Sequence, residues 1–366
     1  MRIIHVVGSD QRRGAEVFAA DLAGALRGKV AAQLVAVIRG ADPPGVSFPC
    51  PTIRLGGRGG GAELPASVRL SRLVAEWRPS LVHVHGGDAL RTVVAAAPRS
   101  RAPVVLRHIG MVRSRATSGF RRLAYGLLMR RADRVVTVSD AVRRQAIDVF
   151  RLSPRQVVSI PNAVDPSRMR AGRDRSSTRA SLGIPHSAPV VLSVGALTWE
   201  KGLEAHLRVG AEVLRRVRDA VHLMVGDGPL QARLRREVGR RGLNGRLRML
   251  GERRDVPDLM GASDVLLIAS RLEGMPGVAI EAGIMSLPVA AFGVGGVSEV
   301  IEDGTSGFVV PAGDARRLAG AVEHLIQDTD DRRRTGEAAR SICMGRFTID
   351  SVVPRYLGVY REAMES

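Results

Sequence analysis

The chain has 366 residues, 45% of them hydrophobic, which is enough for two domains with sizeable cores and excludes a disordered protein. Its net charge of +19 would suit a nucleic acid or an anionic membrane, but almost all the basic residues are arginines spread along the sequence. Aromatic residues, on which single-stranded nucleic acids stack, make up only 3%, so we expect no specific nucleic-acid partner.

The first half of the sequence alternates short apolar runs with stretches of helical periodicity. The apolar runs predict buried parallel strands at residues 3–7, 33–38, 81–85, 104–107 and 134–138. The other stretches predict helices at residues 15–26, 65–77, 89–97, 120–131 and 141–149. This alternation is typical of βαβ units, whose parallel sheet is covered by helices on both faces.

The second half repeats the pattern after a polar break. Residues 168–181 are rich in arginine and serine and are the best candidate for a linker. Strands are then predicted at residues 190–194, 221–225, 247–250, 265–268, 288–291 and 308–310. Residues 349–364 predict one more amphipathic helix. We therefore expect an α/β protein with two doubly wound, Rossmann-like domains, at residues 1–168 and 188–348, joined by a linker at 169–187 and followed by a helix at 349–366.

Neither a secretory signal nor a membrane span is recognisable. Residues 1–7 are too short for a signal, and the longest apolar run, residues 275–297, contains Glu281, two prolines and several glycines. The two cysteines, Cys50 and Cys343, have neither metal-ligand spacing nor the pattern of a disulfide framework. We therefore expect a protein of the reducing cytoplasm.

Most of the unusual polar residues and glycines follow predicted strands. In an open parallel sheet, ligands bind beside the carboxyl ends of the strands. The residues expected there are Gly14, His85, His108, Gly195, Lys201 and Glu273. We expect them to line a cleft between the two halves of the chain.

The stretch from Glu273 to Glu281 carries two carboxylates in a segment rich in glycine and apolar residues. Proline suits a first helical position, so we expect a helix to begin near Pro276, with Glu273 in the loop before it and Glu281 inside it. Gly277 would let an anion approach the free amides at the start of this helix. Glu281 would accept hydrogen bonds from two neighbouring hydroxyls, as on a ribose, and Glu273 from those of a second group.

Lys201 would neutralise a diphosphate in the same place. It is one of only two lysines, with Lys29, and it offers a compact charge that arginine does not. An alternative interpretation is that Lys201 is a surface charge and Glu281 a half-buried helix residue.

A metal site is not expected. His83 and His85 share one face of a predicted strand, but no third ligand is visible near them in the sequence. Residues 113–131, which begin with Arg113 and end with Arg131, mix arginines with apolar residues and are compatible with an interfacial basic helix at an anionic membrane, although we slightly favour an ordinary amphipathic helix that packs on the sheet.

Taken in order, these motifs resemble the retaining GT-B glycosyltransferases of family 4, also called glycosyl transferases group 1, over nearly the whole chain. The most specific motif is the pair Glu273 and Glu281 with seven residues between them, followed by Leu-Pro-Val at 287–289 and Gly-Gly-Val-Ser-Glu at 295–299. Further matches are Gly-Ala-Glu at 14–16, Ile-Pro-Asn-Ala-Val-Asp at 160–165, Glu-Lys-Gly at 200–202, Asp-Val-Pro at 255–257 and Ala-Ser-Asp at 262–264.

The resemblance implies a nucleotide-sugar held mainly by the second domain. It assigns Glu281 to the ribose and Glu273 to hydroxyls of the donor sugar, and implies that the last helix crosses back to the first domain. The residues expected at the diphosphate are Lys201, the amides of Gly277 and Val278, and, from the first domain, Gly14; Gly195 and Gly274 are also expected to bind the donor. Arg253 would lie near the base and His108 near the reacting centre, so the expected catalytic residues are His108, Glu273 and Lys201. On the acceptor side we expect His85, Arg107 and Asn162.

One position departs from the family. Many members have an arginine five residues before the lysine, and here that residue is Ala196. Diphosphate stabilisation would then need help from another cation or a helix N-terminus.

The expected activity is therefore metal-independent, retaining transfer of a sugar, most simply from a UDP-sugar, to an acceptor that the sequence does not identify. A cytoplasmic enzyme with a peripheral contact at the inner face of the membrane fits this interpretation. The alternatives are a sugar-nucleotide epimerase or hydrolase on the same fold and, from another class, a basic nucleic-acid-binding protein.

Overall fold

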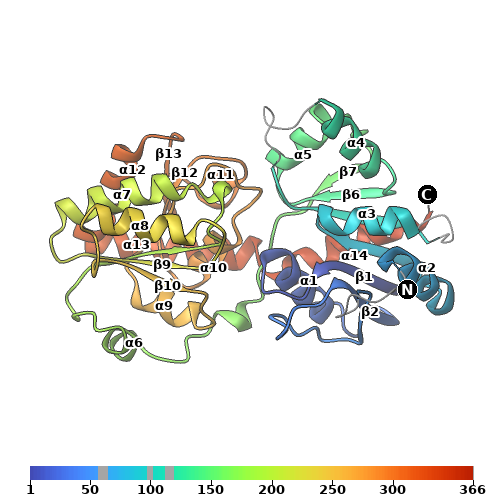
Figure 1. Cartoon of the computed structure of the whole chain (residues 1–366), viewed down its shortest axis with the longest axis horizontal. Coiled ribbons are helices and arrows are strands. Elements are labelled where there is room, and N and C mark those ends of the chain that lie inside the picture. The colour runs from blue at the N-terminus through green and yellow to red at the C-terminus, as the bar shows by residue number, and fades with distance from the viewer. Residues whose placement is uncertain (57–64, 97–101, 112–118, 366) are drawn as a thin grey trace. The chain divides into compact units, whose positions relative to one another are not determined.

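The computed structural model describes residues 1–56, 65–96, 102–111 and 119–365, and the chain divides into two compact units. The first unit consists of Met1–Ala163 together with Ile349–Ser366, and the second of Val164–Thr348 (Figure 1). Each unit is built on one parallel β-sheet. In the described part of the chain, none of the helices has the length and apolarity that crossing a membrane needs.

The first unit holds a seven-stranded sheet in the order β3-β2-β1-β4-β5-β6-β7. Its strands are β1 (Arg2–Ser9), β2 (Ala32–Arg39), β3 (Thr52–Arg54), β4 (Leu81–His85), β5 (Val104–His108), β6 (Arg134–Thr137) and β7 (Val157–Ser159). Its helices are α1 (Gly14–Ala25), α2 (Ala66–Trp77), α3 (Gly87–Ala96), α4 (Gly119–Met129), α5 (Asp140–Asp148) and α14 (Ile349–Glu365).

Both faces of this sheet are covered. On one face, apolar side chains of α2, α3, α4 and α5 form a single core with those of the strands. On the other face the core comes from α1 and the carboxy-terminal helix α14, in which Tyr356 and Tyr360 are fully buried. Residues 349–365 are thus part of the first unit, although the whole second unit separates them from it in sequence.

The second unit holds a six-stranded sheet in the order β10-β9-β8-β11-β12-β13. Its strands are β8 (Val190–Val194), β9 (Val221–Val225), β10 (Leu247–Gly251), β11 (Val265–Ile268), β12 (Val289–Phe292) and β13 (Gly307–Val310). Its α-helices are α6 (Arg175–Ser181), α7 (Leu203–Arg216), α8 (Gln231–Arg240), α9 (Val256–Ala262), α10 (Gly277–Ile284), α11 (Val297–Val300), α12 (Ala315–Gln327) and α13 (Thr329–Arg346). Two short 3-10 helices, η2 (Pro166–Met169) and η3 (Trp199–Lys201), complete the unit. Apolar side chains of α7, α8 and α12 form its main cores.

The expected fold class is confirmed, because both halves of the chain form doubly wound parallel sheets. Two strands at the edge of the first sheet, β3 and β7, were not predicted. Each has only three residues, which is too short for a hydrophobic pattern to stand out from the surrounding loop.

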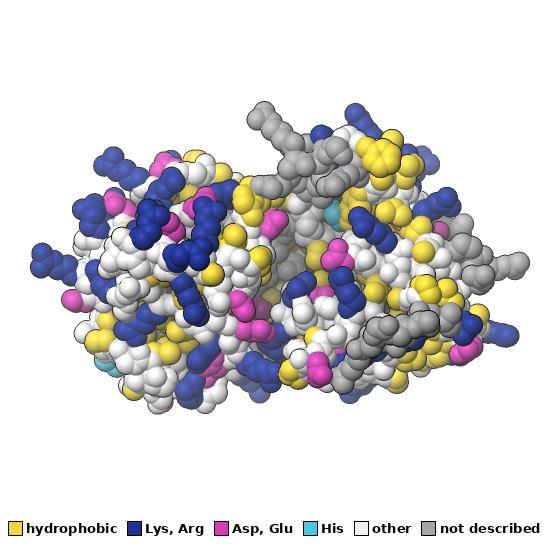
Figure 2. Space-filling model, viewed as in Figure 1, with side chains coloured by type: hydrophobic (Ala, Val, Ile, Leu, Met, Phe, Trp, Pro, Cys, Tyr) yellow, Lys and Arg dark blue, Asp and Glu magenta, His cyan; other side chains and the backbone are white. Residues whose placement is uncertain are grey.

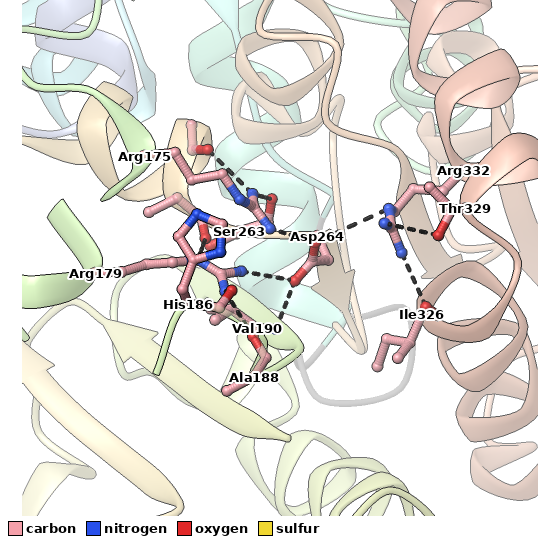
Figure 3. A network of polar contacts seen from close by, with 12 residues as sticks. Arg175, Arg179, His186, Ala188, Val190, Ser263, Asp264, Ile326, Thr329 and Arg332 are labelled. Carbon is pink, nitrogen blue, oxygen red and sulfur yellow. Dashed lines mark hydrogen bonds and ion pairs between the residues drawn. The ribbon is translucent and has the colours of Figure 1, made fainter. Parts of the chain in front are cut away.

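The segment at 169–187, expected as a linker, is instead part of the second unit and contains the helix α6. Arg179 of α6 is 2% exposed, and its guanidinium donates to Asp264 Oδ2 at 3.0 Å and to the carbonyls of His186 and Ala188 at 2.7 Å (Figure 3). Asp264 also accepts from Arg175 at 2.6 Å. Polar composition suggested a solvated segment, but here the arginines are paired with a buried carboxylate.

The strand order places β1 beside β4 in the first sheet and β8 beside β11 in the second. In each sheet, the second and third strands in chain order lie on one side of the first strand, and the fourth strand lies on its other side. Doubly wound folds bind ligands outside the carboxyl ends of the strands at such a reversal. The loops that follow β1, β4, β8 and β11 are therefore the places to look for a site.

Candidate functional site

At the reversal point of the second unit, Lys201 and Glu273 form an ion pair. Lys201 ends η3, in the loop after β8, and Glu273 lies in the loop after β11. Lys201 Nζ donates to Glu273 Oε1 at 2.7 Å, and Ser270 Oγ donates to the same oxygen at 2.6 Å. The Glu273 side chain is 7% exposed, whereas that of Lys201 is 30% exposed. Within the described residues, one of the three N–H groups of the lysine holds the carboxylate, which leaves two for a ligand.

The two loops are held together by their backbones. The amides of Arg271 and Leu272 donate to the carbonyl oxygen of Glu200 at 2.8 and 3.2 Å. Gly202 has a φ of 62°, and a Cβ at this position would lie 2.2 Å from the carbonyl oxygen of Ala269. Only glycine permits this approach, which brings Lys201 to the end of β11.

A buried histidine that the sequence analysis missed fixes the same two loops. His206, in α7, accepts a hydrogen bond from the amide of Ala269 on Nε2 at 3.2 Å, and its Nδ1 lies 3.4 Å from the carbonyl oxygen of Gly202. Burial lowers the pKa of His206 to about 4, so the ring is neutral at pH 7. In the sequence it occupies an inward position of an amphipathic helix, where a core residue is expected, and no other signal marks it.

The pair opens into a small pocket at the end of β8. Its polar lining includes Ser193, Ser270, Lys201 and Glu273, and its walls are apolar side chains of the strands. Ala196 also lines it, at the position where the family resemblance leads us to expect an arginine. Among the described residues that line this pocket, Lys201 is the only lysine or arginine.

The helix α10 begins at Gly277, with Pro276 as the residue before its first turn, close to the expected start. Gly277 and Val278 are partly exposed at this end, and Val278 lines the pocket next to Lys201. Glu281 lies further along the helix and is partly exposed. Its carboxylate lies 4.0 Å from the guanidinium of Arg168, which belongs to η2. Sequence reasoning did not place an arginine there.

Arg253, expected near the base of a nucleotide, has a carboxylate partner in its own loop. Its guanidinium forms two hydrogen bonds with Asp255, at 2.8 and 2.6 Å. These bonds raise the pKa of Arg253 and lower that of Asp255. Asp255 also accepts from Arg173 at 2.7 Å, so the loop before α9 is tied to the segment before α6.

In the first unit, the corresponding loop after β1 leads to Gly14, the first residue of α1. Gly14 is exposed, and apart from its chain neighbours and the backbone of its own helix, no atom of the described residues lies within 4 Å of where its Cβ would be. Glu16, in the first turn of α1, is buried and accepts from Ser9 Oγ at 3.4 Å. Burial raises the pKa of the Glu16 carboxyl.

His108 ends β5 on the face covered by α2 to α5. It is buried between the rings of Tyr125 and Phe150, each with its centroid 6.0 Å from that of the imidazole. Burial lowers the pKa of His108 to about 4. Nothing in the described part of the chain hydrogen-bonds its buried Nε2.

The residues expected on the acceptor side lie together on the opposite face. The guanidinium of Arg107 stacks on Phe18, with its Cζ 3.6 Å from the ring centroid, and donates to Asn162 Oδ1 at 2.8 Å. Arg107 and His85 are each 2% exposed. Both side chains are packed at the end of the sheet, and the acceptor-side role expected for them stays a prediction.

The premise that no third ligand lies near His83 and His85 is wrong, because β1 brings His5 beside them. The candidate ligand nitrogens of the three buried imidazoles lie within 4.8 Å of one another. However, His5 Nδ1 and His85 Nε2 share a hydrogen bond of 3.1 Å, which requires a proton on one of them. The remaining bonds are His5 Nε2 to Gln33 at 3.1 Å and His83 Nδ1 to the Tyr360 hydroxyl at 2.8 Å. In the described part of the chain, Nε2 of His83 and Nδ1 of His85 are buried and have no hydrogen-bond partner.

Comparison with known proteins places both units in one family. The model of "Glycosyl transferases group 1" matches residues 174–342, and that of "Glycosyltransferase Family 4" matches residues 12–168. A 2-deoxystreptamine N-acetyl-D-glucosaminyltransferase of Streptomyces fradiae is 34% identical over 307 residues, 79% of this chain and 72% of that protein. An alpha-D-kanosaminyltransferase of Streptomyces kanamyceticus is 30% identical over 252 residues, 68% of this chain and 65% of that protein.

A solved structure shows the same fold. The Anabaena protein HepE, crystallised with UDP and glucose, superposes with a TM-score of 0.86 over 99% of this chain and 100% of its own, at 23% identity.

Proposed function

The chain belongs to the group 1 glycosyltransferases of family 4, and we propose that it transfers a sugar from a UDP-sugar to an acceptor hydroxyl, with retention of configuration and without a metal ion. The observation that carries the proposal is the Lys201–Glu273 ion pair at the reversal point between β8 and β11. It sets a cation and a hydrogen-bonded carboxylate beside the start of α10, whose amides favour an anion.

The proposed donor site assigns one role to each group of the second unit. Lys201 and the amides of Gly277 and Val278 bind the diphosphate, with Gly195 and Gly274 giving the backbone room. Glu281 accepts the ribose hydroxyls, and Glu273 accepts hydroxyls of the donor sugar. Arg253 is assigned to the base. Within the first unit, the family resemblance assigns Gly14 to the diphosphate and His108 to the reacting centre.

The chemistry proposed for these groups is stabilisation of the leaving diphosphate. Negative charge develops on its oxygen as the bond to the anomeric carbon breaks, and a fixed ammonium and fixed amides stabilise that charge without reorganising. Because both donors to Glu273 bind the same oxygen, its carboxylate is fixed as an acceptor of sugar hydroxyls. We therefore propose attack from the face that the leaving group vacates, with the leaving phosphate taking the proton of the acceptor hydroxyl.

The choice of donor and first acceptor follows the relatives. HepE was crystallised with UDP, which supports a uridine nucleotide here. The Streptomyces fradiae relative is named for transfer to 2-deoxystreptamine, so an amino-cyclitol is the acceptor that we propose first.

The test is the anomeric configuration of the product. Purified protein, 2-deoxystreptamine and a panel of UDP-α-sugars are incubated with EDTA, and the product is analysed by proton NMR. We expect an α-linked product at an unchanged rate in EDTA. A β-linked product would contradict retention, and loss of activity that Mg²⁺ or Mn²⁺ restores would contradict metal independence. Free sugar formed at the same rate without acceptor would favour a hydrolase.

A further inference from the structure

The helix α4 of the first unit exposes an apolar stripe. Phe120, Leu123 and Leu127 lie three and four residues apart and are 79%, 57% and 51% exposed. The spacing puts the three side chains on one face of the helix. On the opposite face, Gly126 and Met129 are buried against the core. α4 is thus apolar on both sides, although the described part of the chain covers only one of them.

The surroundings of this stripe are basic. Residues 119–132 contain four arginines and no acidic residue. Arg130 and Arg131 are exposed just beyond the end of α4, and Arg130 donates to the carbonyl oxygen of Arg151 at 3.1 Å, which brings a third arginine alongside. In Figure 2, at the place that α4 occupies in Figure 1, exposed hydrophobic side chains lie next to dark-blue basic ones. The first part of the segment compatible with an interfacial helix, residues 113–118, lies outside the described residues.

An exposed apolar stripe beside exposed arginines favours one kind of partner over the others. A two-fold contact between copies of this chain through the stripe would bring the arginines of one copy close to those of the other, which is repulsive. A nucleic acid would pair with the arginines but leave two leucines with nothing to contact. An anionic bilayer satisfies both features, since its phosphates pair with arginine while large apolar side chains enter the boundary between headgroups and acyl chains.

We propose that α4 docks the first unit on an anionic lipid surface, with Phe120, Leu123 and Leu127 inserted and Arg130 and Arg131 on the lipid phosphates. Clusters of arginine beside an amphipathic helix bind such surfaces through charge, and the apolar side chains add attraction that salt does not screen. The proposal uses none of the residues assigned to the donor site, so it stands or falls independently of the transferase activity.

The test is sedimentation of the protein with vesicles of phosphatidylcholine alone or with 40% phosphatidylglycerol. The variant carries Phe120→Ser, Leu123→Ser and Leu127→Ser together. The matched control carries Ile53→Ser and Met344→Ser, two other exposed hydrophobic residues outside α4. We expect the wild type and the control to pellet with the anionic vesicles and not with the neutral ones. The α4 variant should bind the anionic vesicles at least tenfold more weakly.

The fold of the variant is checked by its melting temperature, which should match that of the wild type because the three side chains are exposed. Replacing Arg130 and Arg131 by glutamine should weaken binding to anionic vesicles and reduce its dependence on salt. Three results would overturn the proposal. They are no binding to anionic vesicles, equal binding of the wild type and the folded α4 variant, and a wild-type dimer in light scattering that the α4 variant loses.

Discussion

At the residue scale, the account depends on how one lysine and one glutamate are held. Glu273 is almost fully buried and receives hydrogen bonds from Lys201 and Ser270, so its charge is balanced only while the lysine stays in place. Lys201 is the more exposed partner and therefore the group that an incoming anion can reach. We therefore expect replacement of Lys201 to weaken donor binding and catalysis, and loss of the ion pair to lower the local stability.

We predict that Lys201→Ala lowers kcat/KM by about 10²- to 10³-fold, because a fixed charge at the leaving group is lost. The other lysine of the chain gives a matched control, since Lys29 is exposed and lies in the first unit. Lys29→Ala should leave kcat/KM unchanged. Steady-state rates at saturating acceptor test this, and equal rates for wild type and Lys201→Ala would contradict the role of the lysine.

Some of the site could be predicted from sequence and some could not. The spacing of Glu273 and Glu281 and the rare lysine at 201 pointed to two loops that the structure brings together, because glycine and proline between the glutamates break a surface helix. His206 escaped notice, since a histidine at an inward position of a helix looks like any core residue. The burial of Arg107 also could not be foreseen, because it depends on α14, which is distant in sequence.

At the element scale, α6 shows how arginine-rich composition misleads. Arg179 is buried against the start of β8 and beside Asp264, and Asp264 also accepts from the amide of Val190 at 2.8 Å. Arg332 of α13 lies 3.9 Å from the same carboxylate. One aspartate thus joins α6, α13 and the two central strands at the end of the sheet opposite the proposed donor site. Sequence composition does not distinguish such paired arginines from solvated ones.

We predict that Asp264→Ala lowers the free energy of unfolding of the second unit by about 3–5 kcal/mol, because it leaves the guanidinium of Arg179 buried without its counterion. The control Asp330→Ala removes an exposed carboxylate of α13 and should change stability by less than about 0.5 kcal/mol. Urea unfolding at pH 7 followed by circular dichroism measures both. A loss below about 1 kcal/mol for Asp264→Ala would show that the network is not structural.

At the scale of the whole molecule, buried histidines make the fold sensitive to acid. Burial lowers the pKa of His5 and His206 from 6.5 to about 4, and that of His222 to about 3. The pKa values of His83 and His85 lie well below 6.5 for the same reason. Each ring is neutral in the folded protein and protonates in the unfolded chain near pH 6.5, so the unfolded state binds more protons below that pH.

Stability should therefore be fully present above about pH 7 and should fall as the pH drops from 6.5 toward 4. In that range, each buried histidine lowers the free energy of unfolding by at most about 1.4 kcal/mol for each unit by which the pH falls. Both units should respond, since His5 lies in the first and His222 in the second. Urea midpoints at pH 7.5, 6.5, 5.5 and 4.5 measure this effect. A midpoint that does not change between pH 7.5 and 4.5 would contradict neutral burial.

The fold as a whole was predictable because its signal is long and repeated. Strand-length apolar runs separated by helical stretches indicated parallel sheets in both halves, and the two sheets have that form. The return of residues 349–365 to the first unit came only from the family resemblance, since periodicity shows that a helix forms but not what it packs on. Neither the periodicity of the sequence nor the family resemblance predicted the three-residue edge strands.

The most direct test of the central claim is the thermal stability of the protein with UDP-sugars, compared with GDP-, ADP- and dTDP-sugars. At one hundred times its dissociation constant, a UDP-sugar should stabilise the wild type by about 2.7 kcal/mol. Glu281→Ala should lose this shift, and Glu337→Ala, which removes an exposed carboxylate of α13, should keep it. The predicted result is a thermal shift with UDP-sugars that the wild type and Glu337→Ala show and Glu281→Ala does not. No shift with any nucleotide-sugar would contradict a donor site at the ends of β8 and β11.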